Sequence, residues 1–264
     1  MKRRMTAFLL SVLLAGTMVL SASAESIQRP TVAVTVNGEE VELRGTLYGW
    51  TSFLPFDEGI RLFCPEAEIS EEDGLYTAKG EGFTLTARAG DCYFVINGRY
   101  RYVPQGLPAR EEDGMPMLSS VPLCIAMGGT VAWTGQVEFT LGEAPLSEEL
   151  PYTEEELDLI SRVIMHEAGW EPFEGKLAVG SVIMNRVRDG QFPNSVYDVI
   201  YQPNQFAGAT NATPNEDSIV AARLALEGAN VVPGAFFFNG KGIPCWASQN
   251  KAQLYVIGNH AFYG

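Results

Sequence analysis

Residues 153–190 read TEEELDLISRVIMHEAGWEPFEGKLAVGSVIMNRVRDG, and this stretch decides the fold of the second half of the chain. Thr153 and Glu156 have the spacing of a capping box, which predicts the start of a helix. Apolar residues then recur at helical spacing, and Gly169 is expected to end the run. Pro172 suits the first turn of a second helix that continues to about Asp189. The stretch therefore predicts two consecutive helices joined by a short turn.

One acidic residue falls on the apolar side of the first predicted helix. At about 100° per residue, Glu167 lies between Val163 and Ile164. Apolar surroundings and the negative end of a helix both disfavour a charged carboxylate, so the pKa of Glu167 is expected to be raised. A carboxylic acid that keeps its proton near neutral pH is what a general acid requires. The alternative is a helix-end glutamate that faces solvent or binds an arginine.

The same residues resemble a known family. HEAGWEPFEGKLAVGSVIMNRV, at 166–187, and FPNSVYDVIYQPNQF, at 192–206, are similar to the catalytic domain of SleB-type cell-wall hydrolases, the cortex-lytic family of spore-forming bacteria. FFFNG at 236–240, Trp246 and the closing IGNHAFYG extend the resemblance, which covers roughly residues 151–264. Gly169-Trp170 departs from the Arg-Gly or Gly-Gly that many members have at this point.

The resemblance implies a helix-dominated, lysozyme-like domain with a small β element and a glycosidase activity on peptidoglycan. The bond cleaved would join N-acetylmuramic acid to N-acetylglucosamine, with Glu167 as the general acid/base. A lytic transglycosylase is favoured, in which the 6-hydroxyl of the sugar itself attacks. One alternative is a hydrolytic muramidase that uses a second carboxylate, for which Glu171 and Glu174 are the nearby candidates. The other is a non-catalytic glycan-binding or assembly protein on the same scaffold.

Aromatic residues are frequent after residue 170, and sugar faces pack well on aromatic rings. Most of these rings are expected to belong to the core. Trp170 is a candidate substrate-binding residue because it lies beside Glu167, and Gln205, Phe206 and Asn239 are candidates by their position in the family-like segments. Peptidoglycan glycan strands are the expected partner, and no cofactor or metal is expected.

Two other chemistries have partial support. His166-Glu167 is half of a zincin helix motif, but position 170 is Trp where the motif requires a second His. Cys245 and His260 have the residue types of a nucleophilic pair, without a supporting motif. Both are weaker alternatives to an acid/base glycosidase.

The chain begins like an exported protein. Lys2, Arg3 and Arg4 precede an apolar run at 7–20 and then Ala22-Ser23-Ala24, which predicts a signal peptide at 1–24. An uncleaved anchor is the alternative, but the run is short for a membrane span. A secreted protein of the cell wall or spore is expected, with no stable membrane span after cleavage. The net charge of −14 argues against a nucleic-acid partner.

The four cysteines leave their redox state open. An even number in an exported chain permits disulfides, and four cysteines allow three pairings. Three lie in the first half and one in the second, so two bridges within separate domains cannot account for all of them. Buried free thiols are the preferred interpretation. The cysteines are Cys64, Cys92, Cys124 and Cys245.

Residues 25–141 are predicted to form a β-rich domain. Alternating sequence surrounds Asn37-Gly38 and Asn97-Gly98, both typical of hairpin turns, and one short helix is expected near 120–127. VNG at 36–38, INGRYRYVP at 96–104 and GGTVAWTG at 128–135 resemble the stalk-like domain at the N-terminus of copper amine oxidases, without the copper. Two roles stay open for this domain. It either binds the wall or a protein partner, or it acts as a spacer.

The predicted fold class is α+β, with the β-rich domain at 25–141, a linker at 142–150 and the catalytic domain at 151–264. Within the last domain, Ser195 and Asp198 predict another helix start, and Glu216–Glu227 predicts a further helix. Residues 236–238 and 253–258 are expected to be short strands or extended arms.

Overall fold

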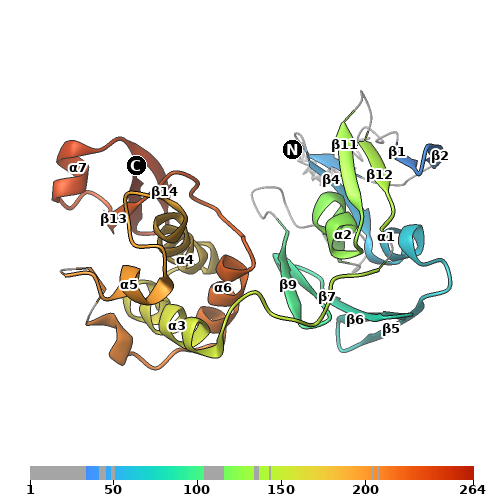
Figure 1. Ribbon diagram of the computed structural model, residues 1–264, viewed down its shortest axis with the longest axis horizontal. Helices are drawn as coiled ribbons and strands as arrows, with labels where there is room; N and C mark the ends of the chain where they lie inside the picture. The colour runs from blue at the N-terminus through green and yellow to red at the C-terminus, as the bar shows by residue number, and fades with distance from the viewer. Residues whose placement is uncertain are drawn as a thin grey trace, which may run out of the picture.

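The computed structural model describes residues 34–41, 46–48, 51–103, 116–133, 137–142, 144–203, 205–206 and 208–264. The predicted signal peptide at 1–24 lies outside these residues. Figure 1 shows strands gathered in the first part of the chain and helices in the second. The fold class is therefore α+β, as the sequence predicts.

The described strands before residue 141 form sheets of three, four and five strands. The five-stranded sheet is a meander in the order β5-β6-β7-β8-β9, and all its neighbours are antiparallel. In the four-stranded sheet, of order β11-β12-β1-β2, strand β1 runs parallel to β12. The three-stranded sheet has the order β10-β4-β3. The strands are β1 (Val34–Val36), β2 (Glu39–Val41), β3 (Thr46–Tyr48), β4 (Thr51–Pro55), β5 (Glu68–Glu72), β6 (Leu75–Gly80), β7 (Phe83–Arg88), β8 (Tyr93–Ile96), β9 (Arg99–Tyr102), β10 (Met117–Ser119), β11 (Thr130–Trp133) and β12 (Val137–Thr140).

Both predicted Asn-Gly hairpins are confirmed. Asn37 and Gly38 join β1 to β2 with φ values of 51° and 83°, and Asn97 and Gly98 join β8 to β9 with 50° and 75°. Two successive residues with positive φ are what the tightest hairpin turn requires, and Asn-Gly meets this need at least cost. The Asn97 side chain also accepts from the backbone N–H of Thr84 at 2.9 Å.

Two short helices pack against these sheets. The predicted helix near 120–127 is confirmed as α2 (Ser120–Ala126), whereas α1 (Phe56–Phe63) was not expected from the sequence. Helix α1 begins directly after strand β4 and buries Phe56 and Ile60 completely. The helix is so short that its apolar spacing does not distinguish a helix from a strand in the sequence. Its buried residues join those of the five-stranded sheet in one core.

The helices after residue 153 enclose a second core. Buried side chains of α3, α4, α5 and α6 form one cluster, in which Ile160, Ile164 and Leu177 are fully buried. The helix starts predicted at Thr153, Ser195 and Glu216 are confirmed to within one residue. The elements are α3 (Glu154–Ala168), α4 (Phe173–Arg188), α5 (Val196–Ile200), the 3₁₀ turn η1 (Ala209–Asn211) and α6 (Glu216–Leu226).

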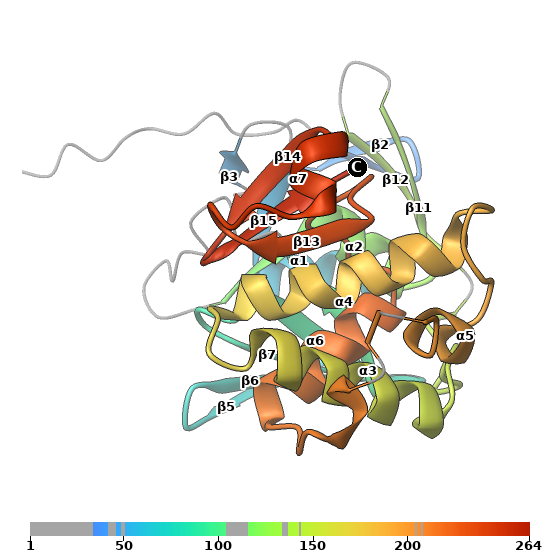
Figure 2. The ribbon, with the colours of Figure 1, turned by 90° about the vertical axis from the view of Figure 1, so that its left-hand side faces the viewer.

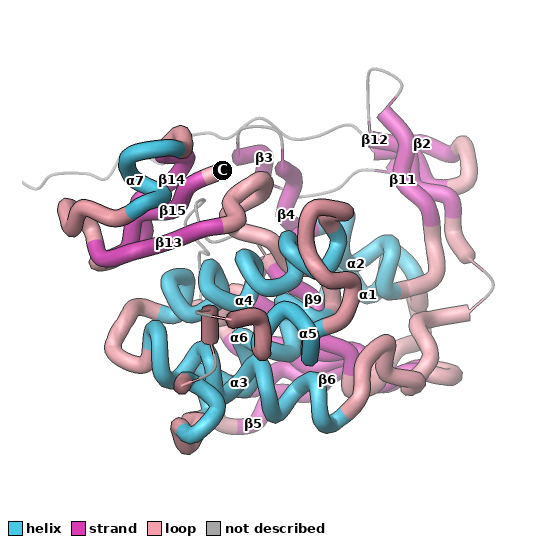
Figure 3. The backbone as a smooth tube through the Cα atoms, turned by 60° about the vertical axis from the view of Figure 1, so that its left-hand side comes forward, coloured by secondary structure: helices cyan, strands magenta, loops and turns pink. Residues whose placement is uncertain are grey.

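A small antiparallel sheet covers α4. Its order is β13-β15-β14, from β13 (Phe237–Gly240), β14 (Gln253–Ile257) and β15 (His260–Tyr263). Figure 2 shows this sheet lying over α4, with α3 on the far side of that helix. Helix α7 (Trp246–Asn250) lies on the outer side of the sheet, as Figure 3 shows. The strands expected at 236–238 and 253–258 are confirmed, while β15 and α7 were not expected.

Strand β9 joins the two parts of the chain through helix α6. Arg99 and Arg101 both bind Glu227, at 2.5 and 3.0 Å, and the Glu227 side chain is only 1% exposed. The Tyr100 ring lies under the Arg223 guanidinium at 5.3 Å from its centroid. Three tyrosines of β8 and β9 pack against the helical core, namely Tyr93, Tyr100 and Tyr102. The first part of the chain is thus held against α6 by both charge and apolar contact.

The four cysteines are all unpaired. Cys92 and Cys124 are buried, and burial raises the pKa of their thiols to about 12 and about 11. Cys64 and Cys245 are partly exposed. Among the described helices, none is both long and apolar enough to cross a membrane.

Candidate active site at the turn between α3 and α4

The start of α3 follows directly from its first residues. The Thr153 hydroxyl accepts from the Glu156 backbone N–H at 3.2 Å, and the Glu156 carboxylate accepts from the Thr153 N–H at 2.8 Å. This is the predicted capping box, and it satisfies donors that the first helical turn leaves free. From this start, the apolar stripe directs Ile160 and Ile164 into the core. Glu167 consequently lies near the C-terminal end of α3, on the edge of the buried face.

The turn after α3 is compact. Helix α3 ends at Ala168, and Gly169 lies so close to the Met165 carbonyl oxygen that a Cβ there would approach it to 2.5 Å. The Glu171 backbone N–H donates to the Ala168 carbonyl at 2.9 Å, and Pro172 caps the start of α4. Proline suits this place because its φ is already helical and the missing N–H would have no partner there. The turn therefore fixes Glu167 and Glu171 on adjoining backbone.

Glu167 is a partly buried carboxyl without a hydrogen-bond partner among the described residues. Burial raises its pKa, and the nearby charges of His166 and His260 act in the opposite direction more weakly. The predicted direction of the pKa shift is confirmed, and desolvation is its main cause. No arginine of the described chain binds it, so the alternative of a surface ion pair is not what the structure contains.

Glu171 has the opposite setting. Its Oε2 accepts from the backbone N–H of Asn259 at 2.8 Å, and its Oε1 accepts from the Asn259 side chain at 3.1 Å. Partial burial raises the pKa of Glu171, but the two hydrogen bonds and the charge of His260 together hold it below its ordinary value. Gly258 precedes Asn259 with φ of +57°, and a Cβ there would collide with the Glu171 carboxylate. Glu171 thus ties the β14–β15 turn to the α3–α4 turn.

The small sheet presents one face to the helices. Phe262 is fully buried against Ala178 and Val182 of α4. Because side chains alternate along a strand, His260 lies on the same face as Phe262, and their ring centroids are 6.2 Å apart. Phe238 of β13 joins them, with its ring 5.4 Å from His260 and nearly perpendicular to it. His260 therefore faces the helix ends that carry Glu167 and Glu171.

The expected substrate-binding residues are distributed unevenly around this turn. Trp170 directly follows the α3 end and is 99% exposed. Phe206 is buried in the helical core, where its ring stacks on Phe238 at 6.3 Å. Gln205 accepts from the Arg186 guanidinium at 2.7 Å. Only Trp170 lies next to Glu167 with an open ring face.

Asn239 lies on the outer face of the small sheet. It pairs with Ala261, which packs against Ala247 of α7. Its side chain donates to the Ile243 carbonyl at 3.2 Å and so supports the loop before α7. The structure thus does not bring Asn239 to Glu167, because neighbouring residues of a strand point to opposite faces.

The two alternative chemistries are not assembled by the described residues. Cys245 caps α7 on the outer face of the sheet, where its sulfur accepts from the Ser248 N–H at 3.3 Å, while His260 is on the inner face. His166 is exposed, and no group of three or more His, Cys, Asp or Glu in the described part of the chain has the arrangement of a metal site.

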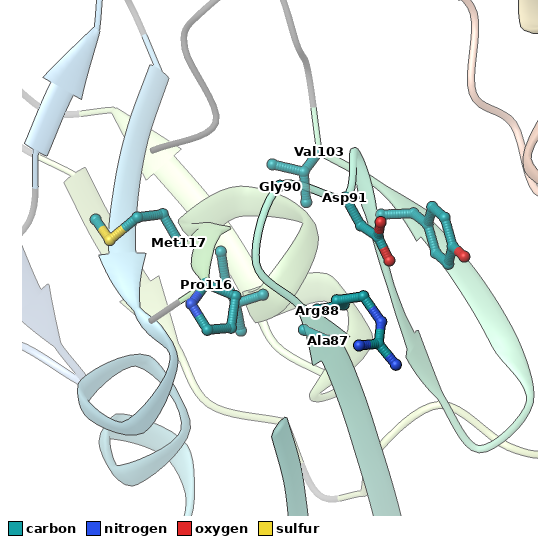
Figure 4. Close-up of a pocket in the computed structure, with 9 residues that line it drawn as sticks. Ala87, Arg88, Gly90, Asp91, Val103, Pro116 and Met117 are labelled. Atoms are coloured by element: carbon teal, nitrogen blue, oxygen red, sulfur yellow. The ribbon is translucent and has the colours of Figure 1, made fainter. Parts of the chain in front are cut away.

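Two recesses lie beside the β7–β8 turn, and the larger one also borders the start of α4. The one in Figure 4, beside Arg88, Asp91 and Met117, has a volume of about 10 Å³, room for roughly one water molecule. A larger recess of about 260 Å³ lies between the β7–β8 turn and α6, and Asp91, Tyr93 and Asp217 are among its lining. Neither includes Glu167.

Comparison with known proteins finds a family and several relatives that are similar to part of the chain. Residues 170–263 match the family described as Cell Wall Hydrolase, and the match begins just after Glu167. The spore cortex-lytic enzyme of Bacillus cereus is 31% identical over 116 residues, which are 42% of this chain and 45% of that protein. The enzyme of the same description from Oceanobacillus iheyensis is 28% identical over 130 residues, 47% of each chain. The chain thus spans less than half the length of these curated relatives.

Two solved structures are also similar to part of the chain. The catalytic domain of the Bacillus cereus SleB protein is 30% identical, with a TM-score of 0.40, and the match covers 43% of this chain and 92% of that one. The catalytic domain of the germination-specific lytic transglycosylase SleB from Bacillus anthracis is 29% identical, again with a TM-score of 0.40, over 43% of this chain and 97% of that one.

The helical part of the chain is thus similar to cell-wall hydrolase domains over residues 170–263. It is also similar to spore cortex-lytic enzymes, so the resemblance seen in the sequence is confirmed for this part. The resemblance of residues 25–141 to a stalk-like domain stays a prediction.

Proposed function

We propose that this protein cleaves the glycan strands of peptidoglycan between N-acetylmuramic acid and N-acetylglucosamine, with Glu167 as general acid and then general base. The observation that carries the proposal is the state of Glu167 itself. It is a half-buried carboxyl with a raised pKa and no hydrogen-bond partner in the described chain, and it lies just before the part of the molecule that matches cell-wall hydrolases. A carboxyl in this state holds a proton for transfer and has no competing partner.

The proposed reaction begins with proton transfer from Glu167 to the glycosidic oxygen. The bond from that oxygen to C1 of N-acetylmuramic acid then breaks, and the N-acetylglucosamine unit leaves with the proton. The 6-hydroxyl of the same muramic acid attacks C1 and gives its proton to the Glu167 carboxylate. The product ends in a 1,6-anhydro sugar, and Glu167 is again protonated for the next cycle.

The position of Glu171 supports this scheme over hydrolysis with a second carboxylate. A hydrolytic glycosidase ordinarily uses two carboxyl groups, one of which activates water or attacks the sugar. Both oxygens of Glu171 are occupied by Asn259, and its lowered pKa makes it a weak base. Glu171 then supports the site by fixing the turn, and the sugar supplies its own nucleophile.

Recognition of the glycan is assigned to the surface next to Glu167. Trp170, with its ring fully open to solvent, offers an apolar face for a sugar. Gln205 is a further candidate contact, whereas Phe206 and Asn239 support the platform through Phe238 and the α7 loop. The protein is proposed to act outside the cytoplasm on the cell wall or spore. Residues 25–141 are proposed to contact the wall or a protein partner.

The test is incubation of the protein with purified peptidoglycan, with turbidity and released fragments followed over time. Soluble fragments with 1,6-anhydro ends are the expected products. Fragments with reducing ends would instead indicate a hydrolase and give Glu171 or water a larger role. Binding without any released fragment over a range of pH would contradict the enzyme assignment and leave a glycan-binding protein.

A further inference from the structure

His260 has a place in the structure that its sequence context does not predict. It begins β15, between Gly240 of β13 and Ile257 of β14, and it shares a face with Phe238 and Phe262. That face is the one turned to the helices, as the burial of Phe262 against α4 shows. The charge of His260 lowers the pKa of both Glu167 and Glu171, in each case as the smallest of the causes.

The Nδ1 atom of His260 is buried and has no hydrogen-bond partner in the described chain. Buried polar atoms without a partner are rare in folded proteins, because each forfeits the hydrogen bonds that water would provide. Each one in a native structure calls for an explanation, such as an ordered water, an ion or a catalytic role. Here the neighbouring residue, Asn259, is hydrogen-bonded to Glu171, so the start of β15 is held at the α3–α4 turn that follows Glu167.

The backbone around His260 is fixed rather than adaptable. The preceding residue, Asn259, gives both its backbone and side-chain N–H groups to Glu171, and its carbonyl accepts from the Lys241 N–H at 2.7 Å. The ring itself packs edge-on against Phe238 and Phe262. A side chain held in this way does not turn to find a partner within the protein, and a ligand that displaces the atoms covering Nδ1 can supply one.

We propose that His260 is a second residue of the Glu167 site, and that its Nδ1 forms a hydrogen bond with a polar oxygen of the sugar bound there, a hydroxyl or an acetamido carbonyl. The inference rests on the proposed function, because the sugar is the substrate named above. Glu171 and Asn259 are then positioning residues, since they hold the strand that presents His260.

The first test is kinetic, on a soluble oligosaccharide of alternating N-acetylglucosamine and N-acetylmuramic acid. His260→Phe keeps a ring between Phe238 and Phe262 but removes the nitrogen, and it should lower kcat/KM by roughly 10- to 100-fold, the range for a lost hydrogen bond in the transition state. His260→Gln restores a hydrogen-bonding group and should recover part of the loss. Thermal unfolding of each variant reports whether the fold is intact.

The matched comparison is His166→Gln. The chain has only two histidines, and the charge of His166 lowers the pKa of Glu167 more than that of His260 does. Removing the His166 charge should raise the pKa of Glu167 further, so the pH profile of kcat/KM should move to higher pH. The maximal kcat/KM should not fall to a comparable extent. A His260→Phe protein that folds and keeps wild-type kcat/KM overturns the proposal. An equal loss of kcat/KM in His166→Gln also overturns it, because the effect would then come from the histidine charge alone.

A second measurement decides the matter if the His260 variants fail to fold. Glu167→Gln protein with ¹⁵N-labelled histidine is titrated with the same oligosaccharide, and the ring nitrogen signals are followed by NMR. The His260 Nδ1 signal should shift on binding while the signals of the exposed His166 stay in place. If the wild-type protein cleaves the sugar but His260 does not respond, the inference fails alone. If the sugar is neither bound nor cleaved, the proposed function fails with it.

Discussion

Glu167 and Glu171 lie one helical turn apart in the sequence, but their surroundings push their pKa values in opposite directions. Desolvation raises the pKa of Glu167, whereas two hydrogen bonds from Asn259 outweigh desolvation at Glu171 and lower its pKa. Two carboxyls separated in this way take different roles, one as a proton donor and the other as a fixed anion. The first setting follows from the position of Glu167 on the α3 stripe. The second depends on a turn that is far away in the sequence.

The raised pKa of Glu167 predicts a cost to stability. A carboxyl whose pKa is higher in the folded state stabilises the fold below its ordinary pKa, near 4.5, and loses that contribution as the pH rises through the raised value. Glu167→Gln is therefore expected to unfold at a higher temperature than wild type at about pH 7, with little difference at about pH 4. Thermal unfolding at both pH values checks this, and equal midpoints at neutral pH would contradict it.

The lowered pKa of Glu171 predicts the opposite pH dependence. Its ionised form is stabilised by Asn259, so this contribution is present above the ordinary pKa near 4.5 and is lost as the pH falls through the lowered value. Glu171→Gln should cost about 1 kcal/mol at neutral pH and less in acid. A double-mutant cycle with Asn259→Ala should show coupling between the two residues. Additive effects would mean that the hydrogen bond from the Asn259 side chain to Glu171 contributes nothing to stability.

The sequence predicted some residues of the site and not others. The cap at Thr153 and the burial of Glu167 follow from local spacing, and both are confirmed by the structure. In the sequence, His260 was weighed as a partner for Cys245. The direction of its side chain depends on β15, and sequence periodicity did not reveal this strand. Asn239 was assigned by its place in a family-like segment, which does not say which face of the sheet it occupies.

At the scale of whole elements, the long helices were predictable and the short elements were not. Helices α3 and α6 carry side-chain caps, α4 follows a proline, and all three have several apolar turns, so local sequence determines where they begin. Helices α1 and α7 have few turns, and α7 is capped by Cys245, which is not a usual capping residue. Their formation depends on the sheets against which they pack.

Helix α3 carries Glu167, so its N-terminal cap should affect stability but not chemistry. Thr153→Ala removes the hydroxyl that accepts from Glu156 and is expected to destabilise the protein by about 1 kcal/mol. The cap lies at the opposite end of α3 from Glu167, so kcat of the folded protein should be unchanged. Chemical unfolding and initial rates measure the two effects separately. A large loss of kcat in a fully folded variant would show that the cap also positions the acid.

At the scale of the whole molecule, the two parts of the chain share a charged contact that the sequence did not predict. Residues 142–150 were expected to be a linker between independent parts, but β9 is bound directly to the end of α6. Glu227→Ala would leave Arg99 and Arg101 without their carboxylate and is expected to cost about 3 kcal/mol. The control is Asp158→Ala, which breaks the exposed pair with Arg162 and should cost about 0.5 kcal/mol. Equal costs would contradict a structural role for this contact.

The same contact refines the expectation for the isolated helical part. Residues 151–264 contain their own buried core, so we expect this fragment to fold and to cleave soluble glycan. It should unfold at a lower temperature than the full chain, because α6 loses its cover of tyrosines and arginines. Circular dichroism against temperature measures both points. An unfolded fragment would show that the division at residue 151 is wrong.

The most direct test of the central claim is the rate of glycan cleavage by Glu167→Gln. The substitution keeps the shape of the side chain and removes the transferable proton, so turnover should fall by roughly 10²- to 10⁴-fold while binding of the oligosaccharide persists. Glu171→Gln, measured beside it, should lose much less, since it supports the turn and transfers no proton. A folded Glu167→Gln protein that cleaves peptidoglycan at the wild-type rate would contradict the assignment of Glu167 as the catalytic acid.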